Sequence, residues 1–152
     1  SPRMAEHVFP ASTYLRYRVD GERDQRLTEL AILTTARELD SQYEWTAHEP
    51  AARNAGLEEE IIELLRFGRP LADAGALPGL GARERTIIRV ARELINEPKV
   101  SAETFVEAQT LFGNKGVMDL TGLVGYYTFV NYTLKTFDLQ RTPGSQLLLP
   151  LP

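Results

Sequence analysis

The sequence predicts an all-α protein of about six helices, built from an internal repeat. Five stretches carry apolar residues at helical spacing, and no stretch shows the strict alternation of a half-buried strand. The segment TELAILTTAREL (28–39) resembles RERTIIRVAREL (83–94) at an offset of 55 residues, which aligns Glu29 with Glu84. The stretches NAGLEEEIIELL and LFGNKGVMDLTGLV extend the similarity loosely. Two copies of a helical hairpin predict a bundle with a pseudo-twofold axis.

Length and composition are those of one globular domain. The 152 residues are 43% hydrophobic and 25% charged, which suits a single sizeable core. We expect one domain over residues 1–152, with its helical core in residues 16–139 and an extended tail in residues 140–152.

Charge and hydropathy argue against several kinds of partner. The net charge is −4 and no cluster of Lys and Arg stands out, so no nucleic-acid partner is expected. No apolar run has the length of a membrane span, and the start of the chain lacks the basic and apolar regions of a signal peptide. We expect a cytoplasmic protein that does not bind membranes.

The absence of cysteine removes disulfides, cysteine–zinc sites and thiol redox chemistry together. The two histidines, His7 and His48, lie far apart in the sequence, so a transition-metal site would need carboxylate ligands as well. We expect neither a metal nor another cofactor.

The first half of the chain should form four helices. Pro10 is expected to break the N-terminal segment, leaving a short helix over residues 12–18 capped by Ser12, and residues 19–24 should form a connection. Residues 27–39 are apolar nearly all round, which predicts a helix buried in the middle of the bundle. Ser41 and Glu44 have the spacing of a capping box for a helix that contains Pro50 and ends at residues 54–56, before a short helix in residues 57–67.

The second half begins with a linker and ends with the longest helix. Residues 68–81 hold four glycines and two prolines and should run over the surface, followed by a helix over residues 82–96 that stops before Pro98. Ser101 should cap a helix over residues 102–112, which Gly113 ends. Residues 117–137 carry the most aromatic side chains, and the proline-rich tail from residue 141 cannot be helical.

One corner of the chain is the candidate site. Glu44 and His48 are four residues apart and share a helix face, and Glu29 lies on the preceding helix. If the two helices pack side by side, two carboxylates and an imidazole converge, and imidazole is suited to proton donation and removal near neutral pH. We therefore take Glu29, Glu44 and His48 as candidate catalytic residues.

Structural explanations stay open for each of these residues. His48 would then be a partly buried helix residue with one hydrogen bond, and Glu44 would serve only the capping box. Glu29 would pair with Arg37 or Arg53 to join helices, as Glu84 in the second repeat suggests. Ser41 is expected to act as a cap and nothing more.

Three aromatic residues are candidates for the substrate pocket. Tyr43 and Trp45 flank Glu44 on the same helix, and Tyr126 lies on the last long helix. Tyr43 and Trp45 are of a type found more often in a core than in a site, and Tyr126 is also compatible with a place in the core. We expect them to bind substrate if the last helix closes the pocket.

The spacing of the candidate residues also resembles a known family. The E-x11-C-x2-C-x3-H motif of the alkylhydroperoxidase D family matches the spacing of Glu29, Ser41, Glu44 and His48, with eleven, two and three residues between them. Both cysteines of the motif are replaced, by Ser41 and Glu44. The string YEWTAHEPAARNAGLEEEIIELL is similar to the carboxymuconolactone decarboxylase branch of that superfamily. Because Ser41 and Glu44 cannot form a disulfide, peroxidase chemistry through two thiols is excluded.

The resemblance implies decarboxylation of a carboxylated lactone from the breakdown of aromatic acids. Such a lyase needs an acid to protonate carbon and a donor to the lactone carbonyl, with no cofactor. His48 would be the acid, and an arginine such as Arg37 or Arg53, or one from another subunit, would bind the substrate carboxylate. Lactone isomerisation or hydrolysis is a related alternative, and a non-catalytic protein that binds a small ligand or only assembles is the alternative from another class.

We also expect a homo-oligomer, from a dimer to a hexamer. The last helix carries more large apolar residues than one bundle face can bury, and the tail adds LLLPLP. The resembled family is oligomeric. The tail would lie across a neighbouring subunit or fold back over its own bundle.

Overall fold

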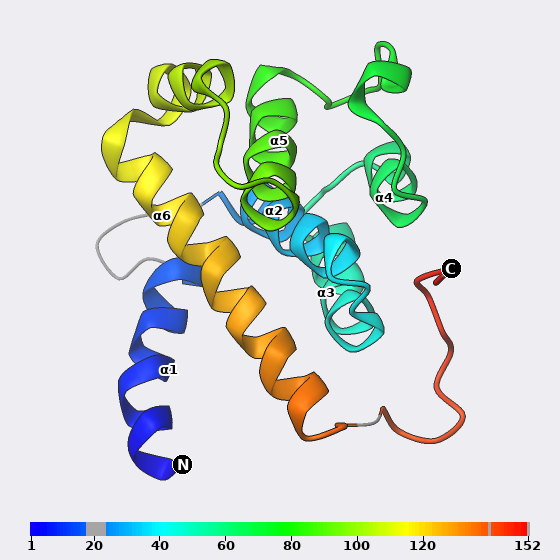
Figure 1. Cartoon of the computed structure of the whole chain (residues 1–152). Helices are drawn as coiled ribbons and strands as arrows, with labels where there is room; N and C mark the ends of the chain where they lie inside the picture. Colours follow the sequence, from blue (N-terminus) through cyan, green and yellow to red (C-terminus); the bar gives the residue numbers. More distant parts are fainter. Residues whose placement is uncertain (18–23, 140, 152) are drawn as a thin grey trace.

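The fold is all-helical throughout the part of the chain that can be described. A computed structural model describes residues 1–17, 24–139 and 141–151, and their regular structure consists of six α-helices and one short 3-10 helix (Figure 1). The elements are α1 (Pro2–Tyr17), α2 (Gln25–Glu38), α3 (Gln42–Asn54), α4 (Glu59–Arg66), η1 (Leu71–Ala74), α5 (Ala82–Asn96) and α6 (Ala102–Thr136). The predicted fold class is confirmed. The connection expected over residues 19–24 lies outside the described residues except for Asp24.

Helices α2 and α5 form the centre of the bundle. Every residue of α2 from Leu27 to Ala36 is buried, as its apolar sequence predicts. The most extensive contacts of α2 are with α3 and α5, and those of α5 are with α2 and α6. The two repeat segments therefore pack against each other, and each packs against the helix that follows it, which is the arrangement that a duplicated hairpin predicts.

Local sequence chemistry sets the helix ends. The Asp24, Ser41 and Ser101 side chains each accept a hydrogen bond from a backbone N–H in the first turn of α2, α3 and α6. Gly56 follows α3 with φ 85°, a left-handed conformation that glycine adopts without strain. Gly113, with φ 64° and ψ 174°, interrupts α6 where the sequence predicts one helix to end and another to begin.

Helix α1 differs from its prediction. It runs from Pro2 to Tyr17 through Pro10, so Ser12 lies inside it and does not cap it. Pro10 removes the N–H that would pair with the Glu6 carbonyl, but both residues are exposed and water can satisfy that carbonyl. Only Leu15 of α1 is buried. The helix is therefore a solvated arm that lies beside α6 (Figure 1).

The linker and the tail are more closely packed than expected. Residues 68–81 contain η1, and both Ala74 and Leu80 reach the core. In the tail Leu149 is buried, and its N–H donates to the Gln42 Oε1 over 2.8 Å. The Pro150 carbonyl accepts from Arg37 over 2.6 Å. This part of the tail thus folds back over its own bundle.

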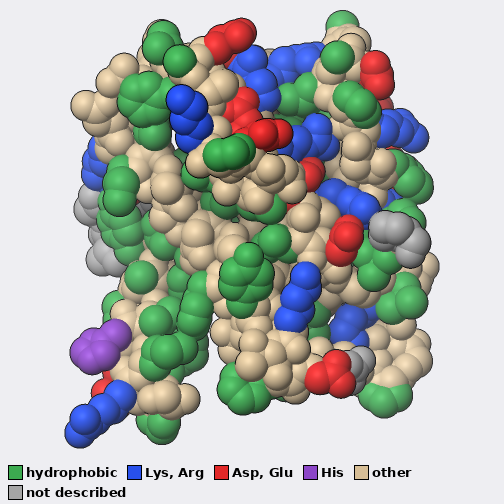
Figure 2. Space-filling view, viewed as in Figure 1, with side chains coloured by type: hydrophobic (Ala, Val, Ile, Leu, Met, Phe, Trp, Pro, Cys, Tyr) green, Lys and Arg blue, Asp and Glu red, His purple; other side chains and the backbone are tan. Residues whose placement is uncertain are grey.

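An apolar notch remains between α1 and the second half of α6. It encloses about 310 Å³ and is visible as a hollow at the lower edge of the molecule, among green side chains (Figure 2). Large apolar side chains near it stay exposed. They are Met4, Phe9 and Phe129. Over the described ranges, none of the helices meets the length and hydropathy of a membrane span.

Candidate functional site

The predicted cluster of Glu29, Glu44 and His48 is formed. Helix α2 brings Glu29 and helix α3 brings the other two, because these helices pack side by side. The Glu29 Oε2 lies 2.7 Å from the His48 Nδ1, and the Glu44 Oε2 lies 3.5 Å from the His48 Nε2. The imidazole therefore sits between two carboxyl groups, one on each ring nitrogen.

The cluster is closed from solvent, and helix α6 completes it. The exposed fractions are 4% for Glu29, 6% for Glu44 and 7% for His48. The Tyr127 ring from α6 meets the imidazole edge-on, with 5.0 Å between the ring centroids, and is itself buried. Edge-to-face contact of this kind fixes the plane of the imidazole.

Burial shapes the protonation of the groups around the imidazole. It raises the pKa of Glu44 above that of an ordinary carboxyl, although the charges of His48 and Arg16 act in the opposite direction. Burial also raises the pKa of the Tyr127 hydroxyl well above its usual value. Both groups therefore hold a proton to a higher pH than they would in water.

The geometry assigns different roles to the two ring nitrogens. With Glu29 ionised, the Nδ1 of His48 carries the hydrogen and donates it over 2.7 Å, a short charge-assisted bond that orients the ring. The Nε2 then faces Glu44, at a separation longer than a strong hydrogen bond. Chemically, this arrangement can hold one proton at the Nε2 or at Glu44 and deliver it to a third group.

The second repeat does not reproduce the cluster. Glu84, the counterpart of Glu29, forms an ion pair of 2.7 Å with Arg26 and accepts from the Gly81 N–H, so it ties α5 to the start of α2. Glu103 stands where His48 stands in the first repeat, and it is exposed. Ser41 caps α3 as expected, since its Oγ accepts from the Glu44 N–H. One half of the duplicated bundle therefore carries the cluster.

The three aromatic residues that are candidates for substrate binding lie in three different surroundings. Trp45 is fully buried, and its Nε1 donates to the Glu49 carboxylate. Tyr43 is exposed and lines a cavity beneath the tail. Tyr126 contacts Tyr127 edge-on, with 5.5 Å between the ring centroids, and lines the notch beside α1.

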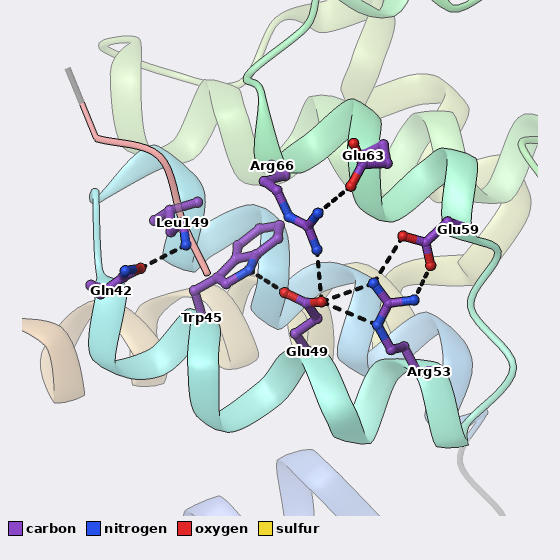
Figure 3. A network of polar contacts seen from close by, with 8 residues as sticks. All are labelled: Gln42, Trp45, Glu49, Arg53, Glu59, Glu63, Arg66 and Leu149. Carbon is purple, nitrogen blue, oxygen red and sulfur yellow. Dashed lines mark hydrogen bonds and ion pairs between the residues drawn. The ribbon is translucent and has the colours of Figure 1, made fainter. Parts of the chain in front are cut away.

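A buried ion network lies on the neighbouring face of α3 (Figure 3). The carboxylate of Glu49 accepts from the Trp45 Nε1 over 2.7 Å, from Arg53 over 2.9 Å and from Arg66 over 2.7 Å. Burial would raise the pKa of Glu49, but hydrogen bonds from Arg53, Trp45 and Arg66 lower it overall. This network joins α3 to α4. The four-residue spacings from residue 45 to 49 and from 49 to 53 could have signalled it.

The predicted arginines are engaged elsewhere. Arg37 binds Asp40 and the carbonyl of Pro150, and Arg53 belongs to the Glu49 network. The arginine whose charge acts on Glu44 and Tyr127 is Arg16, at the end of α1. Sequence analysis missed it because Arg16 is far from the motif and nothing local marks it.

Five cavities line the described surface without including Glu29, Glu44 or His48 in their walls. One of them, of about 260 Å³, lies between α2, α5 and α6, and its wall includes Thr28, the residue before Glu29. Across residues 1–17, 24–139 and 141–151, no group of three or more His, Asp and Glu side chains is arranged to hold a metal ion.

Comparison with known families agrees with the motif. The model of the carboxymuconolactone decarboxylase family matches residues 2–93, which cover α1 to most of α5 and include the whole Glu29–Glu44–His48 cluster. The chain belongs to the carboxymuconolactone decarboxylase family. Comparisons with curated proteins and with solved structures found no match. The match to this decarboxylase family ends inside α5, so Tyr127 lies beyond the matched residues.

Proposed function

We propose that the Glu29–His48–Glu44 cluster catalyses cofactor-free decarboxylation of a small carboxylated lactone. The observation that carries this proposal is the imidazole held between two carboxyl groups, by contacts of 2.7 Å and 3.5 Å, in a buried site. Family membership supports the substrate class.

The reaction would proceed in two balanced steps. First the bond between the ring carbon and the carboxylate breaks, carbon dioxide leaves, and the electron pair moves through the ring double bond onto the lactone carbonyl oxygen. Then a proton from His48 is added to carbon, and the pair returns from oxygen. Glu29 keeps the ring oriented, and Glu44, with its raised pKa, returns a proton to the Nε2.

Turnover of a lactone panel by purified protein tests the proposal. The panel holds γ-carboxymuconolactone and related unsaturated carboxylated lactones, and proton NMR follows loss of the substrate and appearance of the decarboxylated product. His48→Gln should lower the rate by about 10²–10⁴-fold, the usual effect of removing a general acid. Glu103→Gln is the matched control, because Glu103 is the exposed counterpart of His48 in the second repeat.

A non-catalytic small-ligand or assembly role is the second candidate, and the closure of the site favours it. No more than 7% of any residue in the cluster is exposed, and the five cavities lie elsewhere. Absence of turnover across the panel, with a folded protein whose stability falls in His48→Gln, would favour this structural role over catalysis.

A further inference from the structure

We propose that the hydroxyl of Tyr127, on α6, donates a hydrogen bond to the lactone carbonyl oxygen, where the negative charge of the reaction develops. This inference rests on the function proposed above and adds a catalytic residue to it. Tyr127 lies outside residues 2–93, the part of the chain that matches the family model, so the family match does not assign it a role.

The proposed reaction leaves one role unfilled. When carbon dioxide leaves, the electron pair moves onto the carbonyl oxygen, and a hydrogen-bond donor aimed at that oxygen stabilises the transition state. His48 cannot serve as this donor, because it delivers its proton to carbon. Glu29 accepts the hydrogen of the His48 Nδ1, and Glu44 faces the Nε2 and supplies its next proton. The carbonyl therefore needs a fourth group beside the imidazole.

The ring of Tyr127 is in direct contact with that imidazole. The ring centroids of Tyr127 and His48 are 5.0 Å apart, and the two planes are nearly perpendicular, at 87°. Tyr127 comes from α6, whereas the two carboxyl groups come from α2 and α3. A small lactone is about as large as one of these rings, so only groups close to each other can reach its carbon and its carbonyl oxygen together. Tyr127 and His48 meet this condition.

The hydroxyl of Tyr127 is free to bind a ligand oxygen. It makes no hydrogen bond with any residue that the structure describes. Tyr127 is only 3% exposed, yet its oxygen is not among the buried polar atoms that lack a partner, so it borders space that a water molecule can enter. A carbonyl oxygen in that space would accept the hydroxyl hydrogen.

The surroundings of Tyr127 keep this hydroxyl protonated. Burial raises the pKa of Tyr127, and the charge of Arg16 acts in the opposite direction. The charges of Glu29 and Glu44 raise the pKa further. At neutral pH the group is thus an O–H donor that keeps its hydrogen while the carbonyl oxygen accepts. Because the site is buried, this bond strengthens as charge develops on the carbonyl oxygen.

Replacement of Tyr127 by phenylalanine isolates the hydroxyl, because the ring and its contact with His48 remain. The probe is 5-oxotetrahydrofuran-2-carboxylate labelled with carbon-13 at the ring carbonyl, a saturated lactone without the double bond that carries the electron pair. In difference infrared spectra the carbonyl stretch should lie at a lower frequency in the parent chain than in Tyr127→Phe, since a hydrogen bond weakens the C=O bond. In calorimetry the affinity should fall about 2- to 13-fold, the factor for one neutral hydrogen bond.

Turnover of a reactive lactone is the second readout. Tyr127→Phe should lower kcat about 10²–10³-fold with little change in KM, the usual effect of removing one donor to a developing oxyanion. Nitrogen NMR of the two histidines shows whether the loss acts through His48 instead, with the exposed His7 as internal reference. The His48 tautomer should be unchanged in Tyr127→Phe. Tyr132→Phe, which removes an exposed hydroxyl from the same helix, is the matched control.

Several results would each overturn the inference. They are the same carbonyl frequency in the parent chain and Tyr127→Phe, an equal shift in Tyr132→Phe, no binding of the probe by the parent chain, or a changed His48 tautomer. Tyr127→Phe should also melt at the temperature of the parent chain or above it, because the lost hydroxyl has no partner, and a fall of several degrees would show a structural role instead.

The two readouts separate this inference from the proposed function. A carbonyl shift that depends on Tyr127, in a protein that turns over no lactone, would uphold the hydrogen bond while the decarboxylation fails. Turnover at the full rate in Tyr127→Phe would uphold the decarboxylation and overturn the role of Tyr127.

Discussion

Replacing Glu49 by alanine should destabilise the fold by about 2–4 kcal/mol. The buried Nε1 of Trp45 would lose its acceptor, at about 1–3 kcal/mol. Arg66, whose side chain is 18% exposed, would lose one of its two carboxylates, at about 1 kcal/mol. Arg53 is 40% exposed and keeps its ion pair with Glu59, so its share is small.

A second substitution, Glu49→Gln, removes the charge of this side chain but keeps its volume and an oxygen that can accept from Trp45. The free energy of unfolding should therefore fall by only about 1–2 kcal/mol. Because the pKa of Glu49 is lowered, its carboxylate contributes stability above its ordinary value of 4.5, and this contribution is lost as the pH falls through the lowered pKa. The difference between the parent chain and Glu49→Gln should therefore shrink in acid.

Thermal unfolding followed by circular dichroism measures these effects. For a domain of this size each kcal/mol lowers the melting temperature by about 2–4 °C, so Glu49→Ala should lower it by about 4–16 °C. Glu59→Gln is the control, because Glu59 pairs with Arg53 at the surface and should change stability by less than about 1 kcal/mol. If Glu49→Ala unfolds within about 2 °C of the parent chain, the network does not stabilise the contact between α3 and α4.

Three further outcomes are expected. Burial raises the pKa of Glu44, so protonated Glu44 contributes fully to folding stability below pH 4.5, and this contribution is lost as the pH rises through the raised pKa. The urea midpoint of Glu44→Gln should therefore increase relative to that of the parent chain toward neutral pH. Burial raises the pKa of Tyr127, so an alkaline titration of phenolate absorbance should show a component above the range of an ordinary phenol that Tyr127→Phe removes; no such component would contradict the buried position. Light scattering coupled to size exclusion should give a dimer or larger assembly, whereas a mass near 17.1 kDa at micromolar concentration would refute assembly.

The local structure of this chain could be predicted from the sequence alone. Helix α5 was predicted to its end residues, and the interruption at Gly113 was anticipated. The cap of α3 by Ser41 was also foreseen. Such features depend on residues within about four positions of one another, so the chemistry that decides them is contiguous in the sequence.

The sequence also indicated the convergence of Glu29, Glu44 and His48, because a helix face and one hairpin suffice to bring them together. It could not tell which side chains of α3 enter the core instead. Trp45 is next to Glu44 in sequence, yet its Nε1 donates to Glu49, a carboxylate that also accepts from Arg66 of α4.

Only the tertiary structure decided which distant residues complete the site. Tyr127 reaches His48 from α6, and the charge of Arg16, near the end of α1, acts on the pKa of Glu44. Neither residue has a local signal, since its role depends on which helix packs against which. The tail shows the same limit. Its leucines predict burial, but the sequence does not say against which surface; in the structure Leu149 is buried against its own bundle and bonds to Gln42. Which of several equally hydrophobic surfaces pack together depends on their shapes and hydrogen bonds. These shapes and hydrogen bonds become defined only when the chain has folded.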